Sequence, residues 1–161
     1  MVAHTNIAYD DQQWYADSGA NAHITNDLEN LNFKQPFQND DTVAVGNGAS
    51  LGIENIGSTV LTSSLSKFHL KNVLHCPNAS ANLLSIQKFC KDNDCYFKLT
   101  STHFFFVKDN KTKAILLEGK SENGLYPIRL PRGSLKCNQA SFTAFLGVKT
   151  SSLGWHFRLG H

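Results

Sequence analysis

The chain lacks the features that mark several common classes of protein. No apolar run approaches the roughly 20 residues that a membrane-spanning helix needs. The first 15 residues hold no basic segment followed by an apolar one, so we expect no signal peptide and no membrane association. The formal net charge is only +2 and no run of Lys or Arg makes a basic stripe, which argues against direct nucleic-acid binding.

Cysteine is sparse and unevenly spaced, at Cys76, Cys90, Cys95 and Cys137. No Cys-x-x-Cys pair occurs, and the spacing is not that of a disulfide framework. We therefore expect reduced, mostly buried thiols. A metal cluster of the first three cysteines with His75 is the disfavoured alternative. We therefore expect no metal site. We also expect no cofactor, because the glycines at 46, 48 and 52 fall one residue off the dinucleotide-binding spacing and do not begin a helix.

Short strands separated by turns dominate residues 13 to about 130. The patterns predict strands at 14–16, 42–45, 58–62, 68–74, 95–99, 103–107 and 114–117. A final strand opens at Gly124, and Pro127 should keep it short or at a sheet edge. Ser85 is a candidate N-cap for one short helix, in which Ile86, Phe89 and Cys90 share a face. The predicted class is mainly β with one short helix.

The composition changes at both ends of this segment. We expect a linker at 1–12, one domain at 13–131, and a second linker at 132–152, where Gly, Ser, Lys and Asn replace the strand patterns. The last residues, 153–161, have the character of the start of a different domain.

The tripeptide Asp17-Ser18-Gly19 follows an apolar strand and is the main candidate for chemistry. Peptide hydrolysis without a metal or a nucleophilic side chain needs a base that activates water and an acid that protonates the carbonyl or the leaving amine. Two close carboxyl groups that share one proton can do both. Asp17 would be half of such a pair, Ser18 would hydrogen-bond backbone across it, and Gly19 would allow close approach. Alone, the tripeptide is also a common surface turn.

The turn Gly46-Asn47-Gly48 is a strong hairpin signal, because Asn and Gly accept positive φ angles. It follows the Asp17 motif by about 25 residues. A hairpin there could serve as a flap that closes over a substrate and excludes water.

The chain contains no second Asp-Ser/Thr-Gly motif and no internal repeat. Asp41-Thr42 is followed by Val43, whose side chain would prevent the same close approach. If Asp17 acts in a pair, the second aspartate must therefore come from another copy of the chain across a two-fold axis. The sequence predicts a homodimer with its active site on that axis.

Four phrases in order resemble the protease region of copia-type retrotransposon polyproteins. They are residues 14–25, 43–48, 70–77 and 82–85. The last is similar to the apolar-apolar-small element that precedes the C-terminal helix of retropepsins, with Ser85 where retroviral members usually have Gly. The resemblance implies a closed, barrel-like retropepsin fold and a homodimeric aspartic protease. It implies that Asp17, Ser18 and Gly19 form the catalytic loop and Gly46, Asn47 and Gly48 the flap tip.

The same resemblance implies a substrate and a cellular location. The enzyme would cleave its own Gag-Pol polyprotein, in the cytoplasm and within virus-like particles. Residues 153–161 are similar to the opening of the zinc module before copia integrase, with His156 and His161 present but no Cys-x-x-Cys. Candidate scissile bonds in the preceding linker are Phe142–Thr143 and Phe145–Leu146.

Three other interpretations compete with an active protease. A domesticated relative could keep the fold as a dimeric interaction module with little proteolysis. His23 could be the general base of a Ser-His hydrolase, although no acidic partner or oxyanion hole is identifiable, and we expect an ordinary strand residue. A nucleic-acid-binding fragment of integrase would rest on the last seven residues alone, and the net charge opposes it.

Overall fold

The computed structural model describes residues 13–46 and 48–130. The expected linkers at 1–12 and 132–152, the expected integrase segment at 153–161, and the flap residue Asn47 lie outside the described residues. Within the described part, no helix is long and apolar enough to cross a membrane.

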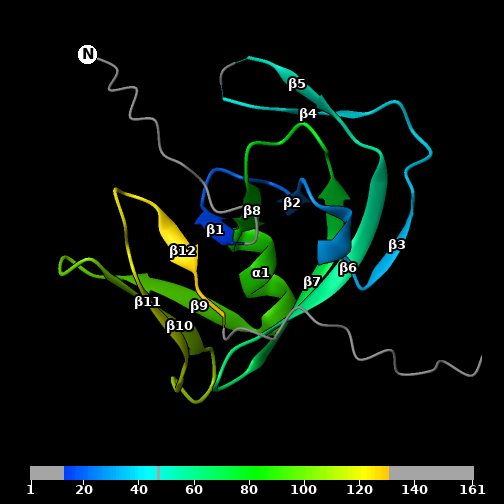
Figure 1. Cartoon of the computed structure of the whole chain (residues 1–161). Helices are drawn as coiled ribbons and strands as arrows, with labels where there is room; N and C mark the ends of the chain where they lie inside the picture. The colour runs from blue at the N-terminus through cyan, green and yellow to red at the C-terminus, as the bar shows by residue number, and fades with distance from the viewer. Residues whose placement is uncertain (1–12, 47, 131–161) are drawn as a thin grey trace, which may run out of the picture.

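Strands dominate the described residues, which form three sheets and one short α-helix (Figure 1). The largest sheet has seven strands in the order β12-β1-β8-β2-β7-β6-β3, and two smaller sheets have the orders β11-β10-β9 and β4-β5. The elements are β1 Trp14–Asp17, β2 Ile24–Thr25, the 3-10 helix η1 Leu28–Asn30, β3 Phe33–Pro36, β4 Thr42–Ala44, β5 Ser50–Gly52, β6 Asn55–Thr62, β7 Lys67–His75, β8 Asn82–Ser85, α1 Ile86–Asn93, β9 Cys95–Leu99, β10 Phe104–Asp109, β11 Ile115–Lys120 and β12 Tyr126–Ile128. The predicted class, mainly β with one short helix, is confirmed.

The strand β1 lies between two strands that come much later in the chain. It pairs in parallel with β8, so that Asp17 faces Ser85 in the register. Its other edge pairs antiparallel with β12, which places Ala16 opposite Tyr126. The end of β1, and with it Asp17, is therefore held from both sides.

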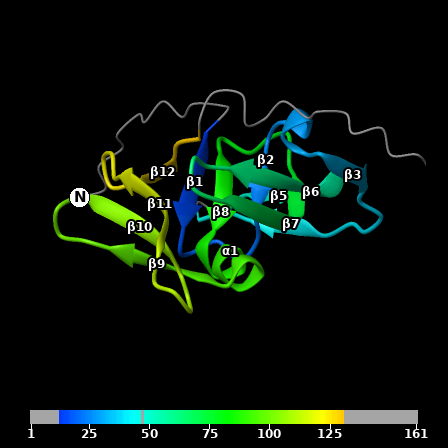
Figure 2. The same cartoon turned by 90° about the horizontal axis from the view of Figure 1, so that it is seen from below.

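The helix α1 begins directly after β8. The Lys88 backbone N–H donates to the Ser85 hydroxyl at 3.4 Å, which confirms Ser85 as the N-cap. The helix ends at Asp94, whose left-handed conformation has a φ of 47°. Figure 2 shows α1 beside β7 and β8, and its Phe89 side chain is fully buried.

A series of aromatic rings carries the core from the large sheet to the strands after the helix. Phe68 packs on Phe89 with ring centroids 4.9 Å apart, and Phe89 meets Phe97 edge-on at 5.6 Å. Phe97 then stacks on Phe105 at 6.0 Å, and Phe105 meets Tyr126 edge-on at 6.0 Å. These contacts join α1, the three-stranded sheet and β12 into one apolar core.

The predicted closed barrel is not what the described residues form. The seven-stranded sheet has two free ends, at β12 and β3, and these two strands do not pair with each other. Each carries a proline, Pro127 in β12 and Pro36 in β3. Proline has no backbone N–H to donate and is confined to edge strands, so neither strand extends the sheet further. The expectation that Pro127 keeps the last strand short and at an edge is confirmed.

A buried polar network ties β2 to β8. The Thr25 hydroxyl donates to Asn82 Oδ1 at 2.7 Å, and the Asn26 backbone N–H donates to the same oxygen at 3.3 Å. The Asn30 side-chain amide donates to the Thr25 hydroxyl at 3.0 Å. Because Asn82 and Thr25 are both fully buried, water could not replace a hydrogen bond lost from this network.

We expect Asn82→Leu to lower the free energy of unfolding by roughly 1–3 kcal/mol for each buried group left unpaired. The apolar side chain keeps a similar volume but removes the acceptor of Thr25 and Asn26. Urea unfolding followed by circular dichroism measures the change. Asn39→Leu, at an exposed position, is the control and should change stability by less than about 0.5 kcal/mol. Equal stability of the two variants would contradict a structural role for the network.

Candidate active site

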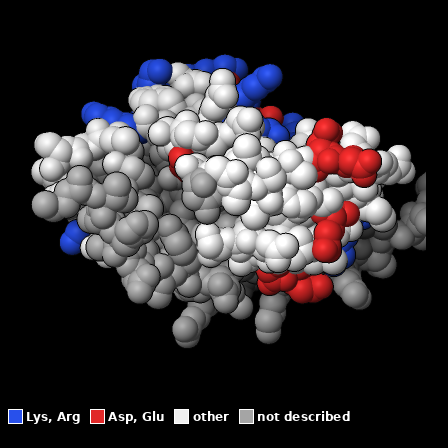
Figure 3. Space-filling model, turned by 90° about the horizontal axis from the view of Figure 1, so that it is seen from above, with Lys and Arg blue, Asp and Glu red and all other residues white. Residues whose placement is uncertain are grey.

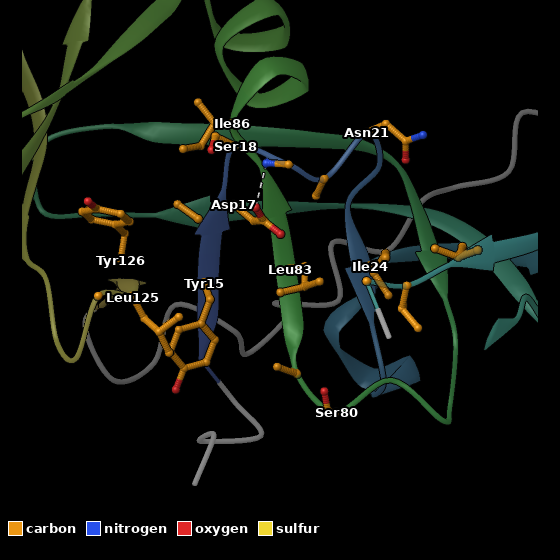
Figure 4. Close-up of a pocket in the computed structure, with 18 of the residues that line it drawn as sticks. Tyr15, Asp17, Ser18, Asn21, Ile24, Ser80, Leu83, Ile86, Leu125 and Tyr126 are labelled. Atoms are coloured by element: carbon orange, nitrogen blue, oxygen red, sulfur yellow. Dashed lines mark hydrogen bonds between the residues drawn. The ribbon is translucent and has the colours of Figure 1, made fainter. Parts of the chain in front are cut away.

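The end of β1 places the Asp17 carboxyl group in the lining of a cavity (Figure 4). Asp17 is half-buried, whereas Ser18 and Gly19 are exposed. The Gly19 backbone N–H donates to Asp17 Oδ1 at 2.7 Å, which fixes the orientation of the carboxylate.

The cavity has a volume of about 640 Å³ and is lined mainly by apolar side chains. Figure 4 shows Leu83 and Ile24 on one side of Asp17, and Tyr15, Leu125 and Tyr126 on the other. Asp17 is the only acidic residue among the described lining residues. A single carboxyl group in an apolar cavity can hold or release a proton, but it cannot act as acid and base together.

The hairpin of β4 and β5 covers the same cavity. Val43, Val45 and Gly46 line it together with Asp17. Val45 donates its backbone N–H to Ala49 O at 3.0 Å, and Gly48 donates to Val45 O at 2.9 Å. Gly48 has a φ of +84°, the conformation expected of a flap-tip glycine, whereas Gly46 does not have a positive φ.

The roles expected for Ser18 and Gly19 are not fulfilled within one chain. A Cβ built on Gly19 would meet only Asp17 Oδ1, at 3.4 Å, which is an ordinary contact. No hydrogen bond of the Ser18 hydroxyl to another described residue is present, and the side chain is exposed. The roles of Ser18 and Gly19 across a pair of loops therefore stay predictions.

His23 does not line the cavity, which argues against it as the general base of a Ser-His hydrolase at Ser18. The side chain is fully buried, and its Nδ1 accepts a hydrogen bond from the Ser85 backbone N–H at 3.1 Å. The pKa of His23 is lowered from 6.5 to about 4, mainly by burial and also by the charge of Lys88, against a smaller opposing effect of Asp92. A neutral His23 therefore holds Ser85 in place opposite Asp17.

The thiols lie away from the cavity. Cys76, Cys90 and Cys95 are free, and none of them lines the space around Asp17. A hydrogen bond from the Cys95 thiol lowers the pKa of Cys90 to about 7, and burial raises the pKa of Cys76 to about 11. Across residues 13–46 and 48–130, no three His, Cys, Asp or Glu side chains gather as a metal site would require.

Sequence reasoning missed one wall of the cavity. Leu99, Gly124, Leu125 and Tyr126 line it although they lie far from the Asp17 motif in the chain. Tyr126 lies beside Ala16 because β12 pairs antiparallel with β1. Local sequence patterns do not predict a pairing between segments so far apart in the chain.

We expect the fold to lose stability between about pH 6.5 and pH 4 partly because of His23. Since its pKa is lowered on folding, the unfolded chain binds the proton first, and the free energy of unfolding falls as the pH drops through this window. The contribution is full above about pH 6.5 and amounts to something on the order of 2–3 kcal/mol. In His23→Gln, urea unfolding should depend less on pH in this window, while exposed His69→Gln should behave as wild type. Parallel pH profiles for all three proteins would refute this assignment.

Comparison with known proteins places the chain among retrotransposon polyproteins. A family model described as "Pol polyprotein, beta-barrel domain" matches residues 14–95, just over half of the chain. Two relatives from Arabidopsis thaliana are the retrovirus-related Pol polyproteins from transposons RE1 and RE2. Each is 36% identical, over 95% and 97% of this chain respectively. No solved structure gives a significant match.

The chain spans about a tenth of the length of these two relatives. The matched segment runs from the first residue of β1 to the first residue of β9 and so includes the Asp17 loop, the β4-β5 hairpin and α1. The chain therefore belongs to the beta-barrel domain family of Pol polyproteins and is a region of a copia-type retrotransposon Pol polyprotein.

Proposed function

We propose that this region is the aspartic protease of its polyprotein, an endopeptidase whose active site is completed by two copies of the chain. The observation that carries the proposal is the placement of Asp17 in a cavity covered by the β4-β5 hairpin. A carboxylate at a strand end, an apolar cleft and a covering hairpin are parts that water-mediated peptide hydrolysis uses, and the proposed second copy would supply the other carboxyl group.

In the proposed reaction, the ionised carboxylate of one Asp17 takes a proton from a water molecule. The water oxygen attacks the peptide carbonyl carbon while the protonated Asp17 of the second copy donates to the carbonyl oxygen. The tetrahedral diol then collapses and the carbon–nitrogen bond breaks: the first Asp17 gives its proton to the leaving amine, and one diol hydroxyl returns its proton to the carboxylate of the second Asp17 as the carbonyl re-forms, so the pair again holds one proton. Two carboxyl groups close together share one proton because like charges at that distance cannot both ionise easily.

Three features of the single chain support a two-copy site. The cavity contains one acidic residue among its described lining. The Ser18 and Gly19 side of the loop is exposed and so accessible to another chain. The hydrogen bond from Gly19 N–H to Asp17 Oδ1 holds the carboxylate in a defined orientation before any partner arrives. Preorganisation of this kind lowers the cost of assembling the pair.

The expected substrate is an extended segment of the polyprotein itself. The cavity walls are apolar, with Ile24, Val43 and Leu83 among them. Figure 3 shows a face whose visible described surface is mostly uncharged, with acidic side chains at one end and Lys and Arg mainly along one edge. Such a surface suits an uncharged peptide rather than a nucleic acid. The proposal places this processing in the cytoplasm, within virus-like particles.

We expect Asp17→Asn to abolish self-processing of a fusion that carries this chain, because the amide cannot supply the base. Intact-mass analysis after incubation measures the products. Asp41→Asn, an exposed aspartate in the loop before β4, is the matched control and should process at the wild-type rate. A peptide with a statine-type diol mimic should inhibit wild type, since it resembles the tetrahedral state. Equal processing by wild type and Asp17→Asn would leave the dimeric interaction module as the better interpretation.

Mixing experiments test the shared site directly. At concentrations where dimers persist, adding one equivalent of Asp17→Asn to wild type should reduce activity to about half, because random pairing places half of the wild-type chains in mixed dimers. Dilution of wild type alone should also reduce specific activity as dimers separate. Activity that is indifferent to both treatments would show that one chain suffices.

A further inference from the structure

The cavity around Asp17 has one wall that is built by strands beyond the helix. Leu99 ends β9, Tyr126 begins β12, and Leu125 precedes it. In Figure 4, Leu125 and Tyr126 lie on the same side of Asp17 as Tyr15, whereas Leu83 and Ile24 lie on the other.

This wall is held firmly in position. Glu122 and Leu125 exchange two backbone hydrogen bonds, at 2.9 and 2.8 Å, around a turn in which Asn123 and Gly124 have φ angles of 50° and 81°. Tyr126 is paired with Ala16 in the register and packs edge-on against the fully buried ring of Phe105. Two backbone bonds and a ring contact fix Leu125 and Tyr126 before any ligand binds.

The exposed residues of this wall are apolar but do not belong to the hydrophobic core. Leu99 is 50% exposed although it ends a strand, and Leu125 is half-buried. Neither belongs to the buried core cluster. Their exposed surface faces the cavity that contains Asp17. Apolar surface gathered in a concave site beside a candidate catalytic group is typical of a side-chain binding pocket.

We propose that Leu99, Leu125 and Tyr126, together with Tyr15, form a specificity pocket for a bulky apolar side chain of the peptide substrate. This inference rests on the proposed function and adds to it a substrate class and the residues that select it. Burial of an apolar side chain against these residues removes both surfaces from water. A charged side chain would lose its hydration there and find no partner, because Asp17 is the only charged residue among the described lining.

The experiment measures cleavage by the whole 161-residue chain of peptides that vary one position at a time around a bond cut in self-processing. Leu125→Ala should lower kcat/KM for the preferred apolar residue by roughly 10-fold or more, at one substrate position only. This is the size of effect expected when a hydrophobic pocket loses a few methyl or methylene groups. Leu125→Arg should reverse the preference there and raise cleavage of peptides with Glu relative to Leu by at least about 10-fold.

Matched controls are Ile115→Ala and Ile115→Arg. Ile115 is 41% exposed and begins β11, in the same three-stranded sheet as Leu99, but does not line the cavity. Both control variants should retain the wild-type preference. Thermal unfolding of all variants identifies any that fails to fold. If either Leu125 variant fails, Leu99→Arg, at a half-exposed position, introduces the same positive charge into the pocket and should reverse the preference in the same way.

The outcomes separate the two proposals. A changed preference at one position in the Leu125 or Leu99 variants, with unchanged controls, supports the pocket. Wild-type preferences in the folded Leu125 and Leu99 variants would overturn the pocket while leaving the protease intact. Absence of cleavage by wild type itself, at concentrations where it is dimeric, would overturn the proposed function and the pocket with it.

Discussion

The parallel pairing of β1 with β8 is the constraint on which the site depends. It places Asp17 opposite Ser85, and Ser85 in turn caps α1 and donates its backbone N–H to His23. Asn82, three residues earlier on β8, anchors Thr25 and Asn26. One buried four-residue strand thus sets the position of the candidate catalytic loop, the start of the helix and the end of the loop that follows Asp17. Because Asn82 and Ser85 are fully buried and make these hydrogen bonds, their loss would also disturb the site.

Local sequence signals predicted the elements whose causes are local. The N-cap at Ser85, the alternation of β6 and β7, and the hairpin around Gly48 each follow from residues within a few positions. The association of that hairpin with Asp17 was also expected, and both line one cavity. Asp17 could be singled out because an apolar strand followed by Asp-Ser-Gly is a local pattern.

Elements with non-local causes were missed. All four residues of β3 are exposed, so no alternation marks the strand, and it forms only because β6 offers an edge. The strands β2, β5 and β8 are too short for a periodic signal, and β8 was interpreted only as a segment before the helix. Whether a sheet closes depends on which edges meet, which composition does not reveal, and the expected closed barrel was therefore wrong for the described residues. The wall at Leu125 depends on the same long-range pairing.

The position of β1 also determines when, during synthesis, the sheet around Asp17 can form. Both of its neighbours, β8 and β12, are synthesised long after it, so this strand has no partner in its sheet while the nascent chain is short. Contacts of high sequence separation form late in folding and slow it. A ribosome must therefore have translated at least as far as Ile128 before the Asp17 end of β1 can be paired on both sides, which delays completion of the cavity around Asp17 until β12 has emerged.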